Sequence, residues 1–316
     1  MSIVSGTFEA VGVLLAVGVL GFVVVSRRIV PTQALDTLSP LALEVALPSF
    51  VFVNILLNFQ PEQTPGWWKL PLWWAGATVV FGVLTACAAP LTRRGSRREF
   101  AAALFYQNAV FVPLVILTEM FGPASQHLVN LFLFTMPFSL FFFSTSHLFY
   151  AESRQGVNWS RVFNPVLVAS LLALILRLTG RHEWVPGFVV SGLRMVGHMA
   201  APALLLLLGG NICLDWTARG RWQPLEVTKF VFVKNICFPA VMVLLVCWLR
   251  PPYEVAMLLI LQSAVPPLTA IPIITAREGG NRALVNQFML VSFVVSLLSI
   301  PASFALFEWW WRRTLL

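Results

Sequence analysis

Two segments of the chain place helix-breaking prolines beside uncharged polar side chains in otherwise apolar sequence. The first, QNAVFVPL, contains Gln107, Asn108 and Pro113. The second, QSAVPPLTAIPIITAREGG, contains the larger set Gln262, Ser263, Pro266, Pro267, Thr269 and Pro272. Proline releases backbone groups where it interrupts a helix, and the N-terminus of a half-helix attracts anions. Neutral amides and hydroxyls bond a carboxylate without neutralising it. The pattern therefore favours a binding site for a small anion.

Three further polar side chains lie within apolar stretches. Lys234 is about two turns, or roughly 10 Å, inside its stretch, and an ionisable group at that depth is a functional hypothesis in a membrane protein. It would add positive potential to an anion site, although snorkelling toward the headgroups is the alternative. Asn54 and Asn211 are amides that would either bond the ligand or brace neighbouring helices, which is the commoner role.

The composition requires a membrane environment for these segments. Of 316 residues, 58% are hydrophobic and 11% are charged, and the mean hydropathy is +0.82. A hydrocarbon core of about 30 Å needs about 20 apolar residues per helical span. That length predicts ten spans, at residues 8–25, 39–59, 70–91, 100–121, 127–150, 162–178, 192–213, 227–249, 254–276 and 284–310.

Positive charge predicts the orientation of these spans. If the N-terminus lies outside the cytoplasm, 13 Lys and Arg residues lie in cytoplasmic segments and 7 in outer ones, as the positive-inside rule requires. We therefore expect a multi-pass protein of the cell (inner) membrane with both termini outside. Basic loops facing anionic lipid account for the net charge of +8, so no nucleic-acid partner is implied.

An internal repeat relates the two halves of the chain. Pro48 and Pro202 are 202 − 48 = 154 residues apart, and Gln107 and Gln262 are 262 − 107 = 155 apart. Five spans per half is an odd number, so the second half would enter the membrane from the opposite side, as in many secondary transporters.

The predicted organisation follows from this repeat. It comprises a first half at 1–150, a cytoplasmic connector at 151–161 and a second half at 162–316. Spans 4 and 9 are expected to be broken, at Pro113 and at the proline cluster that begins with Pro266, and to cross within the membrane.

No cofactor, metal site or enzymatic activity is indicated. The four cysteines lack metal-ligand spacing, and the motifs of intramembrane proteases, serine hydrolases and nucleotide-binding proteins are missing from the sequence. Glu44, Glu119, His147 and His198 are the titratable groups considered for coupling transport to protons, and nothing in the sequence selects among them.

Four motifs resemble, in order, those of the auxin efflux carrier family and its bacterial members: LPSFVF, APALLLLLGGNI, KNICFP and PLTAIPIITAREGG. In the last motif, Pro267, Pro272, Ala276 and Glu278 match the family pattern P-x4-P-x3-A-x-E. Span 4 departs from the family, because Pro113 stands in place of a glycine, which leaves the crossover residue of that span open.

The resemblance implies a ten-helix inverted-repeat carrier of small organic anions, such as auxin-like carboxylates or dicarboxylates. It also implies a homodimer. In each protomer a transport domain (spans 3–5 and 8–10) would move like an elevator against a scaffold (spans 1, 2, 6 and 7). The anion would bind where spans 4 and 9 cross. Two alternatives stay open: a carrier resembling sodium-coupled bile acid symporters, and a membrane receptor that transports nothing.

Overall fold

The computed structural model describes residues 3–149 and 163–314, and within these ranges the only regular secondary structure is helical. Seven helical stretches of the described residues are long and apolar enough to cross a membrane. The expectation of an all-α membrane protein is therefore confirmed. The connector at 151–161 lies outside the described residues.

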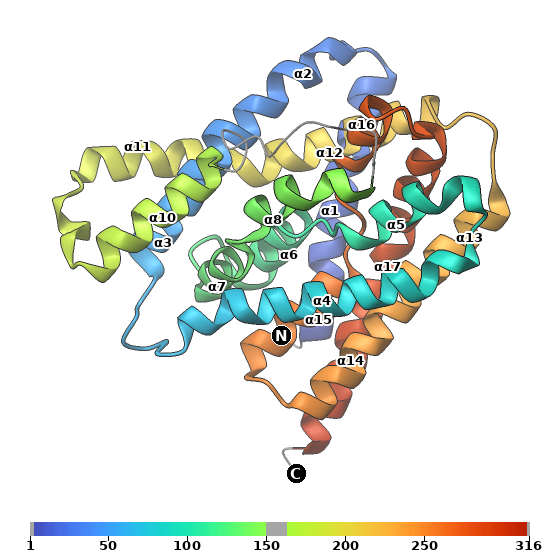
Figure 1. The fold of residues 1–316 in the computed structure, drawn as a ribbon. Helices are drawn as coiled ribbons and strands as arrows, with labels where there is room; N and C mark the ends of the chain where they lie inside the picture. Colours follow the sequence, from blue (N-terminus) through green and yellow to red (C-terminus); the bar gives the residue numbers. More distant parts are fainter. Residues whose placement is uncertain (1–2, 150–162, 315–316) are drawn as a thin grey trace.

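The helices of the first half follow one another with short connections (Figure 1). Their bounds are α1 Ile3–Ser26, α2 Thr32–Pro40, α3 Leu47–Asn58, α4 Leu70–Ala88, α5 Arg97–Phe105, α6 Phe111–Phe121, α7 Gln126–Thr135 and α8 Phe138–Thr145. A π-helical segment, Leu41–Ala46, joins α2 to α3 without a turn, so that they form one continuous stretch.

The helices of the second half are α10 Pro165–Leu178, α11 Gly187–Gly197, α12 Ala200–Thr217, α13 Pro224–Phe232, α14 Phe238–Leu249, α15 Tyr253–Ala264, α16 Ile271–Arg277 and α17 Arg282–Thr314. The π-helical segment Val233–Cys237 joins α13 to α14. The remaining expected spans correspond to shorter apolar helices, namely α6, α10 and α15. The ten-span inverted repeat stays a prediction.

Helices α1 and α12 pack with their backbones in close contact, and glycine makes this possible. A Cβ at Gly209 of α12 would lie 1.9 Å from the carbonyl oxygen of Gly18 on α1, and a Cβ at Gly21 would lie 2.4 Å from that of Leu206. Small residues are the usual means by which membrane helices approach so closely. Helices α10 and α11 both pack on α3, and the three form the group at the left of Figure 1.

An aromatic cluster joins three helices on the other side of the molecule. The rings of Phe230 on α13 and Phe288 on α17 are stacked with centroids 4.4 Å apart, and Phe100 on α5 meets both edge-on. All three side chains are fully buried. This cluster fixes α5, the helix that leads into the first polar segment.

A buried carboxylate secures the connection between α4 and α5. Glu226, at the start of α13, accepts a hydrogen bond of 2.5 Å from Thr92 and pairs with Lys229 at 3.1 Å and Arg93 at 3.6 Å. Its charge is thus compensated by groups from two segments, which ties the basic loop to the first turn of α13.

Candidate functional site

The two polar segments are both breaks between helices, and they lie against each other. The chain is extended between α5 and α6 and again between α15 and α16. The amide of Asn108 donates to Pro266 O at 2.9 Å, and the amide of Leu268 donates to Tyr106 O at 2.9 Å. Gln107 and Pro267 thereby form an antiparallel bridge. Each break satisfies backbone groups of the other, as non-helical backbone at membrane depth requires. The predicted interruption of both segments, and their meeting, is confirmed.

The break between α5 and α6 does not lie at Pro113, so that expectation was wrong. Pro113 is the third residue of α6, where a backbone N–H would have no intrahelical acceptor and proline is tolerated. Pro272 likewise lies in the first turn of α16.

Two amide side chains make this break instead. Gln107 Nε2 donates to the carbonyls of Leu104 at 2.7 Å and Phe105 at 3.2 Å, at the end of α5. Asn108 Oδ1 accepts from the amide of Phe111 at 3.2 Å, at the start of α6. These bonds satisfy backbone groups that a continuous helix would otherwise pair.

Lys234 joins the two breaks. Its side chain is fully buried, and Nζ donates to Gln107 Oε1 and, at 3.1 Å, to the carbonyl of Ser263. That carbonyl has no acceptor role within its own helix, because the residues three and four positions later are Pro266 and Pro267, which lack an N–H. The ammonium therefore replaces the hydrogen bond that proline removes.

Gln262 adds a further link between the breaks. Its Nε2 donates to the carbonyl of Ala109 at 2.7 Å, and the hydroxyl of Ser263 donates to Ile260 O at 2.7 Å. Both side chains are buried. The Gln262 donor thus links the two breaks, whereas the Ser263 hydroxyl is bonded within its own helix, α15.

Asn108 differs from these neighbours because its donor is unused. Its side chain is 1% exposed, and Nδ2 has no hydrogen-bond partner among the residues that the structure describes. Buried amides are normally paired, so an unpaired donor requires an explanation. The residue lines a cavity of about 20 Å³ together with Thr269, Asn211 and Pro267.

A second cavity of about 20 Å³ lies beside Gln107 and Gln262, against α4. Each cavity has room for about one water molecule. A carboxylate with a carbon skeleton would enter only after the crossing and the helices facing it, α12 and α4, move apart.

Sequence reasoning missed Asp215. This carboxylate, on α12, lines the same cavity as Asn108. When its amide nitrogen faces Asp215 Oδ1 and the carbonyl of Arg282, Asn286 donates to Asp215 Oδ1 at 3.1 Å. Arg282 also attracts the carboxylate of Asp215 electrostatically. An acidic residue within the apolar stretch NICLDW was the available signal.

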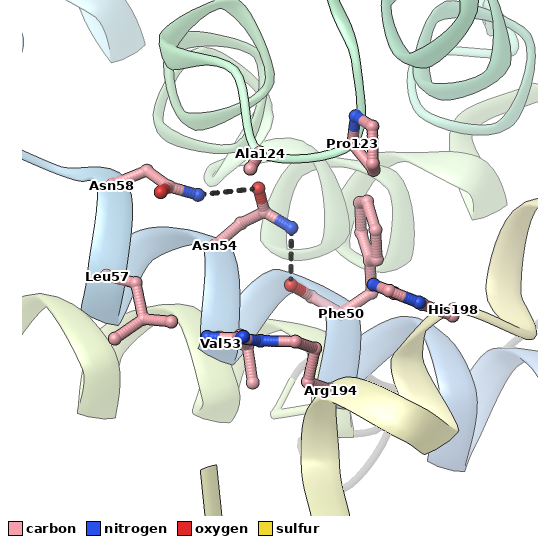
Figure 2. A pocket seen from close by; sticks show the side chains of 9 residues that line it. All are labelled: Phe50, Val53, Asn54, Leu57, Asn58, Pro123, Ala124, Arg194 and His198. Atoms are coloured by element: carbon pink, nitrogen blue, oxygen red, sulfur yellow. Dashed lines mark hydrogen bonds between the residues drawn. The ribbon is translucent and has the colours of Figure 1, made fainter. Parts of the chain in front are cut away.

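Asn54 is not at the crossing. It lies on α3 in the wall of a separate pocket of about 300 Å³ that also contains Arg194 and His198 and shares no lining residue with the two small cavities (Figure 2). Of the other titratable candidates, Glu44 and Glu119 are exposed, and the side chain of His147 lies outside the described part.

Comparison with known families agrees with this architecture. A family model described as membrane transport protein matches residues 7–158 and 145–303. The chain belongs to the auxin efflux carrier family. As a member of this family, the protein is a multi-pass membrane transporter. The auxin efflux carrier family consists of transporters and not of enzymes. A search of curated proteins found no match to the chain.

Proposed function

We propose that this carrier is a secondary transporter of small organic anions, carboxylates above all, which it binds where the α5–α6 and α15–α16 breaks cross. The supporting observation is the buried Nδ2 of Asn108, which has no partner in the described part of the chain and lines a cavity with Thr269 and Asn211. A carboxylate oxygen is the acceptor that this donor lacks, and the first turn of α6 adds the positive end of its dipole.

The electrostatics of the crossing favour an anion that binds moderately. Lys234 supplies the positive charge, and its hydrogen bonds are already made within the protein. Apart from Asp215, the other groups that line the cavity beside Asn108 are neutral. Asp215 faces Asn286 and Arg282, so its charge is offset locally. Moderate affinity allows release, which transport requires.

We propose alternating access of the elevator type to open the site. The close backbone contact of α1 with α12, and the packing of α10 and α11 on α3, support a scaffold formed by spans 1, 2, 6 and 7. The breaks belong to the other helices, in spans 3–5 and 8–10, which would form the moving domain. The small size of both cavities supports a closed state of this cycle.

The remaining assignments rest on sequence and family. We propose two inverted repeats of five spans, termini outside the cytoplasm, location in the inner membrane, and a homodimer. No cofactor enters the mechanism.

A thermal-shift screen of purified protein against mono- and dicarboxylates, followed by counterflow of the best ligand in proteoliposomes, tests the function. We expect saturable exchange of labelled carboxylate without sodium. Exchange that requires sodium would favour the mechanism of bile acid symporters. Binding without any exchange would indicate a receptor, and selection of cations would refute the proposal.

A further inference from the structure

The largest pocket described above lies away from the crossing, between α3, α11 and the connection from α6 to α7. Its volume is about 300 Å³, within the range of small-molecule sites. Phe50, Val53 and Leu57 of α3 line one wall, and Pro123 and Ala124 of the α6–α7 connection face them (Figure 2). The pocket is thus apolar on the sides that would meet the body of a ligand.

Two nitrogen-bearing side chains, one in α11 and one directly after its last residue, Gly197, give the pocket its electrostatic character. Arg194 and His198 are four residues apart, on one face of the helical stretch Gly187–Thr217. Both line the pocket, and of the described residues that line it none is Asp or Glu. Arg194 forms no ion pair within the part of the chain that the structure describes. An unpaired guanidinium within a membrane-spanning stretch is costly unless it faces water or an anion.

The Asn54 amide of this pocket is hydrogen-bonded within α3. Asn58 Nδ2 donates to Asn54 Oδ1 at 3.1 Å, and Asn54 Nδ2 donates to Phe50 O at 3.0 Å (Figure 2). This chain of hydrogen bonds holds Asn54 against its own helix and consumes its acceptor. Among the described residues no partner is found for the guanidinium of Arg194, which is the charged donor of the pocket.

We propose that this pocket is a second binding site, for a small organic anion with a compact apolar body, and that it is separate from the crossing. The carboxylate pairs with Arg194, His198 lies beside it, and the apolar body packs against Phe50, Val53 and Leu57. A ligand bound there contacts α3 and α11 on one side and the α6–α7 connection on the other. The site stands on its own residues and does not depend on the function proposed for the crossing.

Ligand-observed NMR titration of phenylacetate against the full chain in nanodiscs tests this site. The Asn108→Ala background weakens binding at the crossing, so that the remaining binding reports the pocket. In that background we expect Arg194→Gln to weaken phenylacetate binding at least about tenfold, as loss of a charge-assisted hydrogen bond implies. Uncharged phenylacetamide should bind at least about tenfold more weakly than phenylacetate for the same reason.

Two further variants complete the test. Arg181→Gln removes a positive charge that is also exposed, stacks on Trp184 and lines none of the three cavities, so binding should be unchanged. Ala124→Phe leaves every charge in place and fills the pocket from its exposed loop, so binding should be lost. Unchanged binding in both Arg194→Gln and Ala124→Phe, or equal binding of the amide, would overturn the second site. Loss of all binding in Asn108→Ala alone would overturn it too, while supporting the site at the crossing.

Discussion

Replacing Lys234 with methionine should destabilise the crossing of the two breaks. Methionine keeps an unbranched side chain of similar length and removes the donor. The carbonyl of Ser263 and Oε1 of Gln107 would then both lose their bond to Nζ, and Pro266 and Pro267 cannot supply an N–H to the carbonyl instead.

The expected magnitude follows from these two acceptors. Each buried acceptor left unpaired costs about 1–3 kcal/mol. The variant no longer buries an ammonium group, which offsets part of this cost. We expect a net destabilisation of about 1–4 kcal/mol, seen as a lower melting temperature in detergent.

Lys69→Met is the matched control, because Lys69 is exposed and lies outside the crossing. Its melting temperature should equal that of the unmodified protein. A double-mutant cycle with Gln107→Leu isolates the contact between Lys234 and Gln107. Lys234→Met should lower the free energy of unfolding by less in the Gln107→Leu background, where the acceptor is missing. Equal melting temperatures for Lys234→Met and Lys69→Met would refute the role assigned to the ammonium.

Two other predictions concern packing and orientation. Gly209→Ala should destabilise the protein by at least about 1–3 kcal/mol, as overpacking does, because its Cβ would meet the carbonyl of Gly18. Gly12→Ala is the control, because no atom lies within 4 Å of the new Cβ. Equal melting temperatures for the two variants would contradict the close contact of α1 and α12. Cysteines introduced at Ser2 and Gln155 should react with impermeant reagents from opposite sides of the membrane, Ser2 from the outside; labelling of both from one side would contradict the proposed orientation.

The sequence predicted the break in span 9 because its cause is local. Consecutive prolines at 266 and 267 remove two N–H groups from any helix that contains them. Their effect needs no tertiary contact. The same reasoning failed in span 4, because Pro113 lies in the first turn of α6 and does not interrupt the helix there.

The rest of the site depends on contacts that no single segment reveals. Gln107 and Asn108 bond the backbone at the two ends of the break, and residue type alone does not predict this, because other amide and hydroxyl side chains bond the backbone inside continuous helices. Lys234 was singled out by its depth in an apolar stretch, but its partners, Gln107 in the α5–α6 break and Ser263 in α15, follow only from the fold. Asn54 resembles Asn108 in sequence context, and only the packing of α3 against α11 assigns it to another pocket.

The central claim is that the amide donor of Asn108 binds the transported anion. Asn108→Asp tests it directly, because the carboxylate keeps an acceptor for the amide of Phe111 and removes the unpaired donor. Loss of the hydrogen bond from the Asn108 amide to the ligand weakens binding by about 1–3 kcal/mol. Repulsion between the new carboxylate and the anionic ligand weakens it further.

Counterflow of a labelled carboxylate in proteoliposomes, at a concentration below saturation, is the decisive measurement. We expect Asn108→Asp to exchange label at least about tenfold more slowly than the unmodified carrier. Exchange at the original rate by a properly folded Asn108→Asp variant would contradict it.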